Sequence, residues 1–213
     1  MKLYTFYESG NSWKVRILLE QLGVPYEKVI VDLLKWEQKT EDFMRDFNPR
    51  GQVPVLEDEG RRFWDSAACL VYIARKYDRQ DWLPTDAGAM AEIMQWVALG
   101  SSEIQFGLQY TRRGVMRDRW IAGNLEELQA IGKTALRAME WRLSDHDWLA
   151  LDRITIADLA CFPYVHYSHE AKLPLEKDYP GVARWVARCN AMPNWAAAPR
   201  APTREYADMA VKA

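Results

Sequence analysis

Cysteine is scarce in this sequence, and its scarcity excludes several kinds of protein. Only three cysteines occur among 213 residues, at Cys69, Cys161 and Cys189. Their spacing forms neither a zinc-binding pattern nor the framework of a disulfide-rich secreted domain. The three histidines likewise show no grouping with carboxylates that would indicate a metal site. We therefore expect a protein without a metal, whose thiols are reduced and lie in or near the core.

Long apolar runs and an excess of one charge are also absent. No stretch approaches the length of a membrane-spanning helix, and the first residues alternate like a strand and lack the apolar core of a signal peptide. The 28 Lys and Arg residues against 30 Asp and Glu residues give a net charge of -2, which does not favour nucleic acid or a membrane surface as a partner. A cytoplasmic protein is the expectation.

The two halves of the chain differ in their hydrophobic pattern. With 49% hydrophobic residues, the chain is long enough for one large or two small domains. Up to residue 78, short strand-like segments alternate with helical ones. After a polar stretch broken by Pro84, only long helical patterns follow, the first over residues 89–113. We predict an α/β domain at 1–78, a linker at 79–88 and an all-helical domain at 89–213.

Two helix starts can be predicted in the second half. Asn124 is placed to cap a helix whose apolar residues recur at helical spacing, namely Leu125, Leu128, Ala135, Leu136, Met139 and Leu143. In the second, Thr155 can accept the backbone N–H of Asp158, whose carboxylate reaches back to the N–H of Thr155. This capping box predicts a further helix and a structural role for both side chains.

Residues 48–56 carry a Val-Pro pair at the start of an apolar strand, which is unusual because proline has no N–H to donate to a sheet. If the Val53-Pro54 bond is cis, the N–H and C=O of Val53 turn outward and can pair with a bound peptide as an extra strand. Asp65 and Ser66 then open an apolar helix, and their side chains suit a ligand with both an α-ammonium and an α-carboxylate. These segments predict a site for a peptide thiol.

Several motifs resemble the glutathione transferase family in their order and separation. They are the Val-Pro strand with the acidic residue and serine that follow it, the turn at residues 9–16, the capping box at 155–158, and the segments 179–182 and 192–193 that bracket a helix. The turn is similar to the serine-type active site of bacterial members. The resemblance covers nearly the whole chain. It implies a thioredoxin-like N-terminal domain, an all-α C-terminal domain, glutathione as co-substrate, no metal, and a homodimer.

The resemblance implies that a hydroxyl stabilises the thiolate of glutathione. A thiol with a pKa of about 8.5 is mostly protonated at neutral pH, and lowering that pKa by one to two units takes about 1.4–2.7 kcal/mol. One hydroxyl donor and a helix N-terminus can provide that free energy between them. By the resemblance the donor is Ser9, which opens the turn, although a serine at this position is also a common N-cap.

Two neighbours are alternatives to Ser9 as the thiolate donor. Asn11 matches an auxiliary or main donor of some bacterial relatives, and Ser12 falls in the first helical turn. All three, Ser9, Asn11 and Ser12, are therefore catalytic candidates. Tyr7 is interpreted as a packing residue, because its register relative to the first helix differs from that of the tyrosine that other classes of the family use.

The resemblance also implies the residues that bind glutathione, which are Lys39, Gln52, Val53, Pro54, Asp65 and Ser66. The backbone of Val53 pairs with the cysteinyl part. Asp65 and Ser66 hold the γ-glutamyl end, toward which Gln52 also points. Lys39, beside Gln38, neutralises the glycyl carboxylate; the alternative is a solvated surface lysine. Asp65 stands where glutamate is more usual, and its shorter reach leaves its direct contact with the ligand open.

The second substrate is expected to meet the first helices of the C-terminal domain. Candidates for an apolar pocket with a cationic edge are Trp13, Phe106, Tyr110 and Arg113, with Arg112 beside them; each is equally suited to a core or surface position. No cysteine occurs in the turn at residues 8–13. This absence disfavours redox chemistry through a protein thiol.

The predicted function is conjugation of the glutathione thiolate to a small electrophile, as in detoxification. One alternative is a glutathione-dependent reductase of disulfides or peroxides with the same fold. The other is a non-catalytic binding module, since a fold does not determine a function. The complete set of Ser9, Val53-Pro54 and Asp65-Ser66 weighs against a binding module, because a decayed site would not need all of them.

Overall fold

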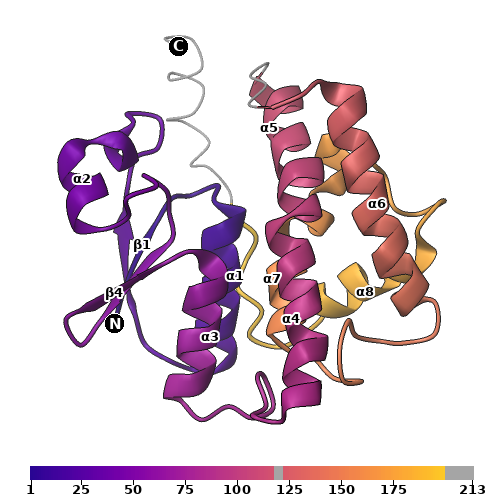
Figure 1. Cartoon of the computed structure of the whole chain (residues 1–213), viewed down its shortest axis with the longest axis horizontal. Coiled ribbons are helices and arrows are strands. Elements are labelled where there is room, and N and C mark those ends of the chain that lie inside the picture. Colours follow the sequence, from indigo (N-terminus) through magenta and orange to yellow (C-terminus); the bar gives the residue numbers. More distant parts are fainter. Residues whose placement is uncertain (118–121, 200–213) are drawn as a thin grey trace. The chain divides into compact units, whose positions relative to one another are not determined.

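The computed structural model describes residues 1–117 and 122–199, which form two compact units (Figure 1). The first unit contains residues 1–73 and residues 196–199, and the second contains Ala74–Trp195. The stretch 79–88 belongs to the second unit. Residues 200–213 of the predicted C-terminal domain lie outside the described part of the chain. The chain thus returns to its first unit after completing the second.

The first unit is built on a four-stranded sheet with the order β2-β1-β3-β4. Its strands are β1 Lys2–Thr5, β2 Glu27–Ile30, β3 Val55–Asp58 and β4 Arg61–Trp64. β1 and β2 are parallel, whereas β3 runs antiparallel to both β1 and β4. The helices α1 Gly10–Gln21 and α3 Ser66–Lys76 lie on one side of the sheet; α2 Glu41–Asp46, preceded by the 3-10 turn η1 Glu37–Lys39, lies on the other (Figure 1). This arrangement confirms the thioredoxin-like α/β domain.

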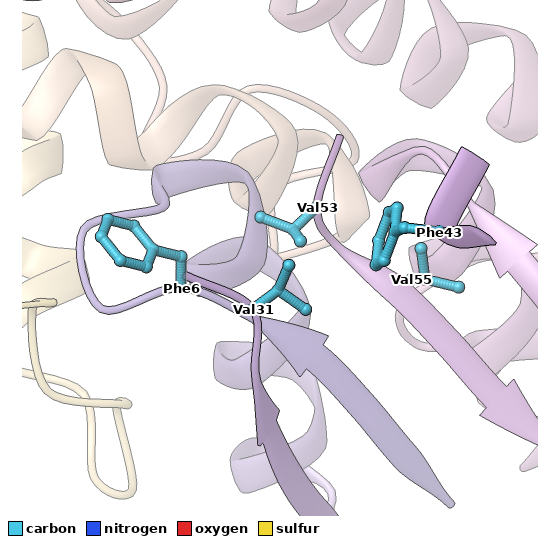
Figure 2. Packing of buried hydrophobic residues seen from close by; sticks show 5 residues of the cluster. All are labelled: Phe6, Val31, Phe43, Val53 and Val55. Carbon is cyan, nitrogen blue, oxygen red and sulfur yellow. The ribbon is translucent and has the colours of Figure 1, made fainter. Parts of the chain in front are cut away.

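The two faces of the sheet bury different side chains, because strand residues alternate in direction. Leu3 pairs with Leu56, and both are fully buried. Tyr4 pairs with Val55 on the opposite face. There an apolar cluster, the α2-side cluster, consists of Phe6, Val31, Phe43, Val53 and Val55 (Figure 2). Burying each such side chain contributes about 1.5–3 kcal/mol, so the cluster holds α2 and the segment before β3 against the sheet.

The second unit is all helical in its described residues. Its helices are α4 Ala87–Ser101, α5 Tyr110–Arg117, α6 Leu125–Leu143, α7 Ile156–His166 and α8 Pro180–Asn190, with the short elements η2 Gln105–Gln109 and η3 Ser168–Ala171. In α7, every residue from Ile156 to Val165 is buried, so this helix forms the centre of the unit. The predicted fold class is confirmed. Within residues 1–117 and 122–199, no helix combines the length and apolar character needed to cross a membrane.

The single helix predicted over residues 89–113 is wrong, because three helical elements replace it. α4 ends at Ser101, and Ser102 leaves the helical region with φ -113° and ψ -96°. The π-helical turn η2 follows before α5 begins. In η2, a Cβ on Gly107 would stand 2.2 Å from the backbone nitrogen of Gly132 in α6. This close approach depends on a distant segment, so the local hydrophobic pattern does not reveal the π-helical turn.

Both predicted helix starts are confirmed. Asn124 caps α6: its Oδ1 accepts the N–H of Glu127, and its own N–H donates to the Glu127 carboxylate, each at 3.0 Å. At α7, the N–H of Thr155 donates to Oδ2 of Asp158 at 2.9 Å, and the Oγ1 of Thr155 accepts the N–H of Ala157 at 3.2 Å. The helix expected between residues 179–182 and 192–193 is α8.

Candidate active site

The strand register gathers several predicted site residues at one edge of the sheet. Tyr4 lies opposite Val55, so the segment before β3, which contains Val53, lies at the carboxyl end of β1. Val55 also lies opposite Trp64, so the chain leaves β4 at the same edge. α1 follows β1 and α3 follows β4 in the chain, and the N-termini of both helices are therefore located there.

Ser9 is the N-cap of α1. Its backbone is extended, with φ -72° and ψ 106°, and its Oγ accepts the N–H of Ser12 at 3.1 Å. This bond uses a lone pair of the oxygen and leaves the hydroxyl proton available. The side chain is half-buried. Ser9 can therefore cap the helix and donate to a ligand at the same time, so the two interpretations of this residue are compatible.

The alternatives to Ser9 differ in their accessibility. Asn11 is half-buried in the first turn of α1, and its amide forms no hydrogen bond with another described residue. Ser12 is only 1% exposed, on the buried side of α1 with Val15. This enclosure weighs against Ser12 as the thiolate donor and favours the more accessible Ser9 and Asn11. Tyr7, interpreted as a packing residue, is 41% exposed.

Trp13 is a core residue of the first unit. It is 1% exposed, and its Nε1 donates to the carbonyl of Ala196 at 2.8 Å. The guanidinium of Arg16 donates to the carbonyl of Ala197 at 3.3 Å. These bonds hold the end of the described chain against α1 within the first unit. This internal contact weighs against the prediction that Trp13 contacts the electrophile.

The bond between Val53 and Pro54 is cis, as the peptide-pairing hypothesis requires. The side chain of Val53 is buried in the α2-side cluster (Figure 2), and Pro54 is buried beside it. The N–H and C=O of Val53 form no hydrogen bond with another residue in the described ranges. A buried side chain with an unpaired backbone is the arrangement that lets a bound peptide add to a sheet.

Asn48 shapes the loop that precedes the cis bond. It is 2% exposed; its Oδ1 accepts the N–H of Arg50 and its Nδ2 donates to the C=O of Gln52, each at 2.9 Å. Gly51 has φ +58°, and a Cβ there would lie 2.6 Å from the carbonyl oxygen of Gln38. Glycine is therefore required on both conformational and steric grounds. The loop packs directly against η1, and the side chain of Gln52 stays exposed.

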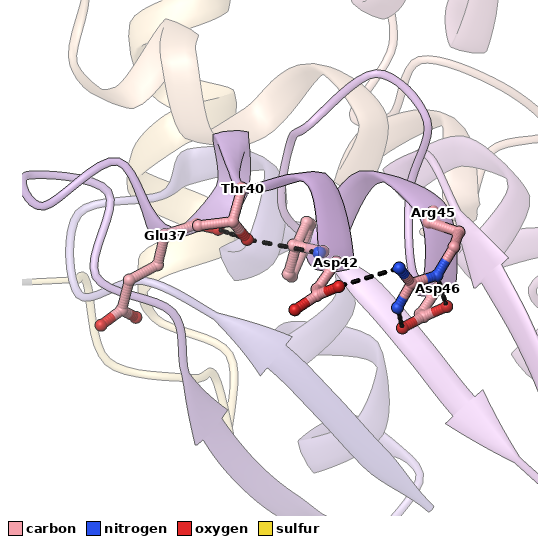
Figure 3. Close-up of polar contacts among 6 residues, drawn as sticks. Glu37, Thr40, Asp42, Arg45 and Asp46 are labelled. Atoms are coloured by element: carbon pink, nitrogen blue, oxygen red, sulfur yellow. Dashed lines mark hydrogen bonds and ion pairs between the residues drawn. The ribbon is translucent and has the colours of Figure 1, made fainter.

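Lys39 lies where η1 meets this loop. Its side chain is exposed, and its Nζ donates to the C=O of Arg50 at 2.9 Å. The next residue, Thr40, accepts the N–H of Phe43 at 3.3 Å and donates to the C=O of Glu37 at 2.9 Å, which ends η1 and begins α2 (Figure 3). An ammonium group has three donors, so Lys39 keeps two of them for a ligand.

Asp65 and Ser66 form the N-terminus of α3. Asp65 has a left-handed backbone, φ +75°, and its Oδ1 accepts the N–H of Ala67 at 2.9 Å. Its Oδ2 pairs with the guanidinium of Arg50 at 3.1 Å. Ser66 is 8% exposed at the first position of the helix. Arg50 is not among the predicted site residues; it occupies the variable position of the Asn-Pro-x-Gly pattern, and only its distance to Asp65 identifies it.

The other predicted electrophile contacts belong to the second unit. Phe106 on η2 is 41% exposed, and its ring meets that of Tyr110 edge-on with centroids 5.2 Å apart. Arg113 is half-buried on α5. Arg112 is held by Glu170 and lies 4.5 Å from the ring centre of Tyr167. Phe106 and Tyr110 thus present a partly exposed aromatic surface, whereas Arg112 already has an anionic partner.

All three cysteines are free and buried, as predicted. Burial raises the pKa of Cys69 to about 12 and also raises the pKa of Cys189. These two thiols therefore stay protonated near neutral pH and are poor nucleophiles. In the part of the chain that the structure describes, no group of His, Cys, Asp and Glu residues is arranged to hold a metal ion.

Comparison with known proteins identifies the family of this chain. Residues 1–75 match the family described as "Glutathione S-transferase, N-terminal domain", and residues 122–193 match "Glutathione S-transferase, C-terminal domain". Glutathione S-transferase 1 of Schizosaccharomyces pombe is 30% identical over 212 residues, which cover 90% of this chain and 91% of that relative.

Solved structures show the same likeness over nearly the whole chain. A possible glutathione S-transferase from Rhodopseudomonas palustris is 33% identical with a TM-score of 0.82, over 94% of this chain and 98% of that one. A glutathione transferase from Burkholderia graminis, solved with two glutathione molecules bound per subunit, is 28% identical with a TM-score of 0.79, over 95% of this chain and 88% of that one. This protein belongs to the glutathione S-transferase family.

Proposed function

We propose that this protein conjugates the thiolate of glutathione to a small electrophile, with the hydroxyl of Ser9 stabilising the thiolate. The observation that carries the proposal is the gathering of Ser9, the unpaired Val53 backbone and Asp65-Ser66 at one edge of the sheet. A hydroxyl donor beside a helix N-terminus has the strength needed to hold a thiol in its ionised form. Relatives named as glutathione S-transferases support the same reaction.

The proposed pose places the γ-glutamyl end of glutathione at the N-terminus of α3. Asp65 receives the α-ammonium, and Ser66 with the first N–H groups of the helix receives the α-carboxylate. The exposed Gln52 adds a contact to this end. The backbone of Val53 pairs with the cysteinyl part, and Lys39 receives the glycyl carboxylate. This pose uses both carboxylates and the ammonium of the peptide.

Replacing Ser9 by alanine is expected to raise the pKa of bound glutathione by about one unit, because one hydrogen bond to the thiolate is lost. Turnover at neutral pH falls accordingly, while binding stays nearly unchanged. Ultraviolet titration of the bound thiolate measures the shift. Asn11→Ala should produce a smaller shift, and the enclosed Ser12→Ala should produce none.

The loss of the helix cap must be separated from the loss of the donor. Ser9→Gly removes the same hydroxyl but costs an N-cap only a few tenths of a kcal/mol. We expect the same thiolate pKa in Ser9→Gly and Ser9→Ala. An unchanged pKa in both variants, together with a raised pKa in Asn11→Ala, would transfer the role of donor to Asn11.

The rival reaction is reduction of a disulfide or peroxide by two glutathione molecules. One observation favours keeping it: the Burkholderia graminis relative holds two glutathione molecules per subunit. The aromatic pair Phe106 and Tyr110 instead favours a flat apolar electrophile. The half-buried Arg113 favours an electrophile that carries an anionic substituent. We therefore place conjugation first.

A direct comparison of two assays tests the proposed reaction. Purified protein is given a chloronitrobenzene electrophile or hydroxyethyl disulfide, at equal glutathione concentration, and both rates are measured. We expect conjugation to be the faster reaction. Disulfide turnover about tenfold above conjugation would correspond to a barrier lower by roughly 1.4 kcal/mol and would reverse the ranking. Bound glutathione without turnover of either substrate would favour the binding module.

Membership of the family leads us to propose three further properties. The protein acts as a homodimer, it is located in the cytoplasm, and its reaction serves detoxification. Glutathione is proposed as a co-substrate and not as a permanently bound cofactor, and no metal takes part in the proposed step.

A further inference from the structure

Arg50 stands out among the residues around the proposed glutathione site, because it contacts both ends of that site. Its guanidinium lies 3.1 Å from Oδ2 of Asp65, at the γ-glutamyl end. Its carbonyl accepts Nζ of Lys39 at 2.9 Å, at the glycyl end. Its N–H donates to Oδ1 of the buried Asn48 at 2.9 Å. The backbone of Arg50 is therefore fixed, and its side chain extends from a rigid base toward Asp65.

The carboxylate of Asp65 is held from two sides. Ala67 binds Oδ1 through its N–H at 2.9 Å, and Arg50 binds Oδ2 at 3.1 Å. A carboxylate has about four lone-pair positions, so both oxygens keep one for a ligand. Its orientation is set because the two contacts act on different oxygens.

The ion pair has little to do with folding stability. The side chains of Arg50 and Asp65 are 46% and 37% exposed, and pairs exposed to this degree contribute little to the free energy of unfolding. Orientation of the carboxylate matters more for ligand affinity, because a side chain that is already in place loses less freedom when the ligand binds.

We propose that Arg50 is a positioning residue that holds the Asp65 carboxylate in the direction that receives the α-ammonium of glutathione. This proposal rests on the proposed function. Arg50 itself does not contact the peptide in this account. Its contribution therefore depends on the presence of both the ammonium and Asp65, and it is independent of the thiolate.

Calorimetry with two ligands tests the proposal. One is glutathione, and the other is glutaryl-cysteinyl-glycine, in which hydrogen replaces the α-ammonium. We expect Arg50→Ala to weaken glutathione binding about fivefold and to leave the affinity for the analogue unchanged. In an Asp65→Ala background, Arg50→Ala should add nothing. Arg50→Lys should restore part of the affinity, and the pKa of the bound thiol should stay that of the wild type in all of these variants.

Arg45 provides a matched control in the same unit. It is an exposed arginine on α2 that pairs with Asp42 at 2.8 Å and Asp46 at 2.7 Å (Figure 3). Arg45→Ala removes the same charge from the surface and should leave both affinities unchanged.

Three outcomes would overturn the proposal. Equal losses of affinity for both ligands in Arg50→Ala would mean that Arg50 acts on a carboxylate or through the loop. Unchanged glutathione affinity in Arg50→Ala would show that Arg50 does not position Asp65, and it would leave the proposed function intact. Absence of glutathione binding to the wild-type protein would reject the proposed function, and the positioning role with it.

Discussion

Replacing Asp158 by alanine is expected to lower the free energy of unfolding by about 3–5 kcal/mol, because each buried donor left without a partner costs about 1–3 kcal/mol. Asp158 is fully buried. Its Oδ1 accepts the N–H of Leu149 at 3.1 Å and Nε1 of Trp185 at 2.9 Å, and its Oδ2 accepts the N–H of Thr155 at 2.9 Å. Denaturant unfolding of wild type and variant measures the difference.

Trp185→Phe is the graded control for this prediction. It removes one of the donors, keeps an aromatic ring at a fully buried position, and should cost less than Asp158→Ala. A loss below about 1 kcal/mol in Asp158→Ala, the value of a single ordinary hydrogen bond, would show that the carboxylate does not organise this part of the second unit.

The carboxyl group of Asp158 also makes the free energy of unfolding depend on pH. Burial raises the pKa of Asp158 to about 6, against the hydrogen bonds that favour the carboxylate. The folded protein therefore keeps a proton between pH 4 and 6 that the unfolded chain has lost, and the free energy of unfolding falls as the pH rises through this window. The stabilisation that the protonated Asp158 adds to the free energy of unfolding is fully present below about pH 4 and is lost above about pH 6. Asp158→Asn should lack this slope.

Replacing Asp65 by alanine is expected to weaken glutathione binding tenfold or more, since a charge-assisted contact is typically worth about 1.5–3 kcal/mol. The variant loses the anion that receives the α-ammonium. It also loses the acceptor for the N–H of Ala67, which is part of the start of α3. Calorimetric titration with glutathione measures the affinity.

Asp65→Asn separates these two losses. Its amide oxygen can still accept the N–H of Ala67, but it carries no charge, so the affinity should fall nearly as far as in Asp65→Ala. Asp42→Ala, which removes an exposed carboxylate from α2, should leave binding unchanged. Equal affinity in the wild type and Asp65→Asn would mean that charge at this position is not what binds the γ-glutamyl end.

Much of the fold follows from local sequence. The strand and helix segments of the first unit, the caps at Asn124 and Thr155, and the Val53-Pro54 and Asp65-Ser66 motifs are all visible in the sequence, because hydrophobic period, capping and turn chemistry depend on residues within a few positions. For the same reason, the change from mixed α/β to purely helical patterns correctly predicts two different kinds of domain.

Other features depend on contacts between residues that are far apart in the chain. Trp13 is enclosed by a bond to Ala196, which lies 183 residues away, so its place in the core could not be predicted from the turn around Ser9. The helix predicted over 89–113 ends at Ser101, and Gly107 in the following π-helical turn approaches Gly132 in another helix. Arg50 reaches Asp65 only because the register of β3 and β4 brings their loops to one edge of the sheet. The sequence by itself determined the two kinds of domain, the elements of the first unit and the helix starts at Asn124 and Thr155. Tertiary structure decided which side chains are enclosed and which are within reach, because packing and strand register are set by distant residues that no local pattern contains.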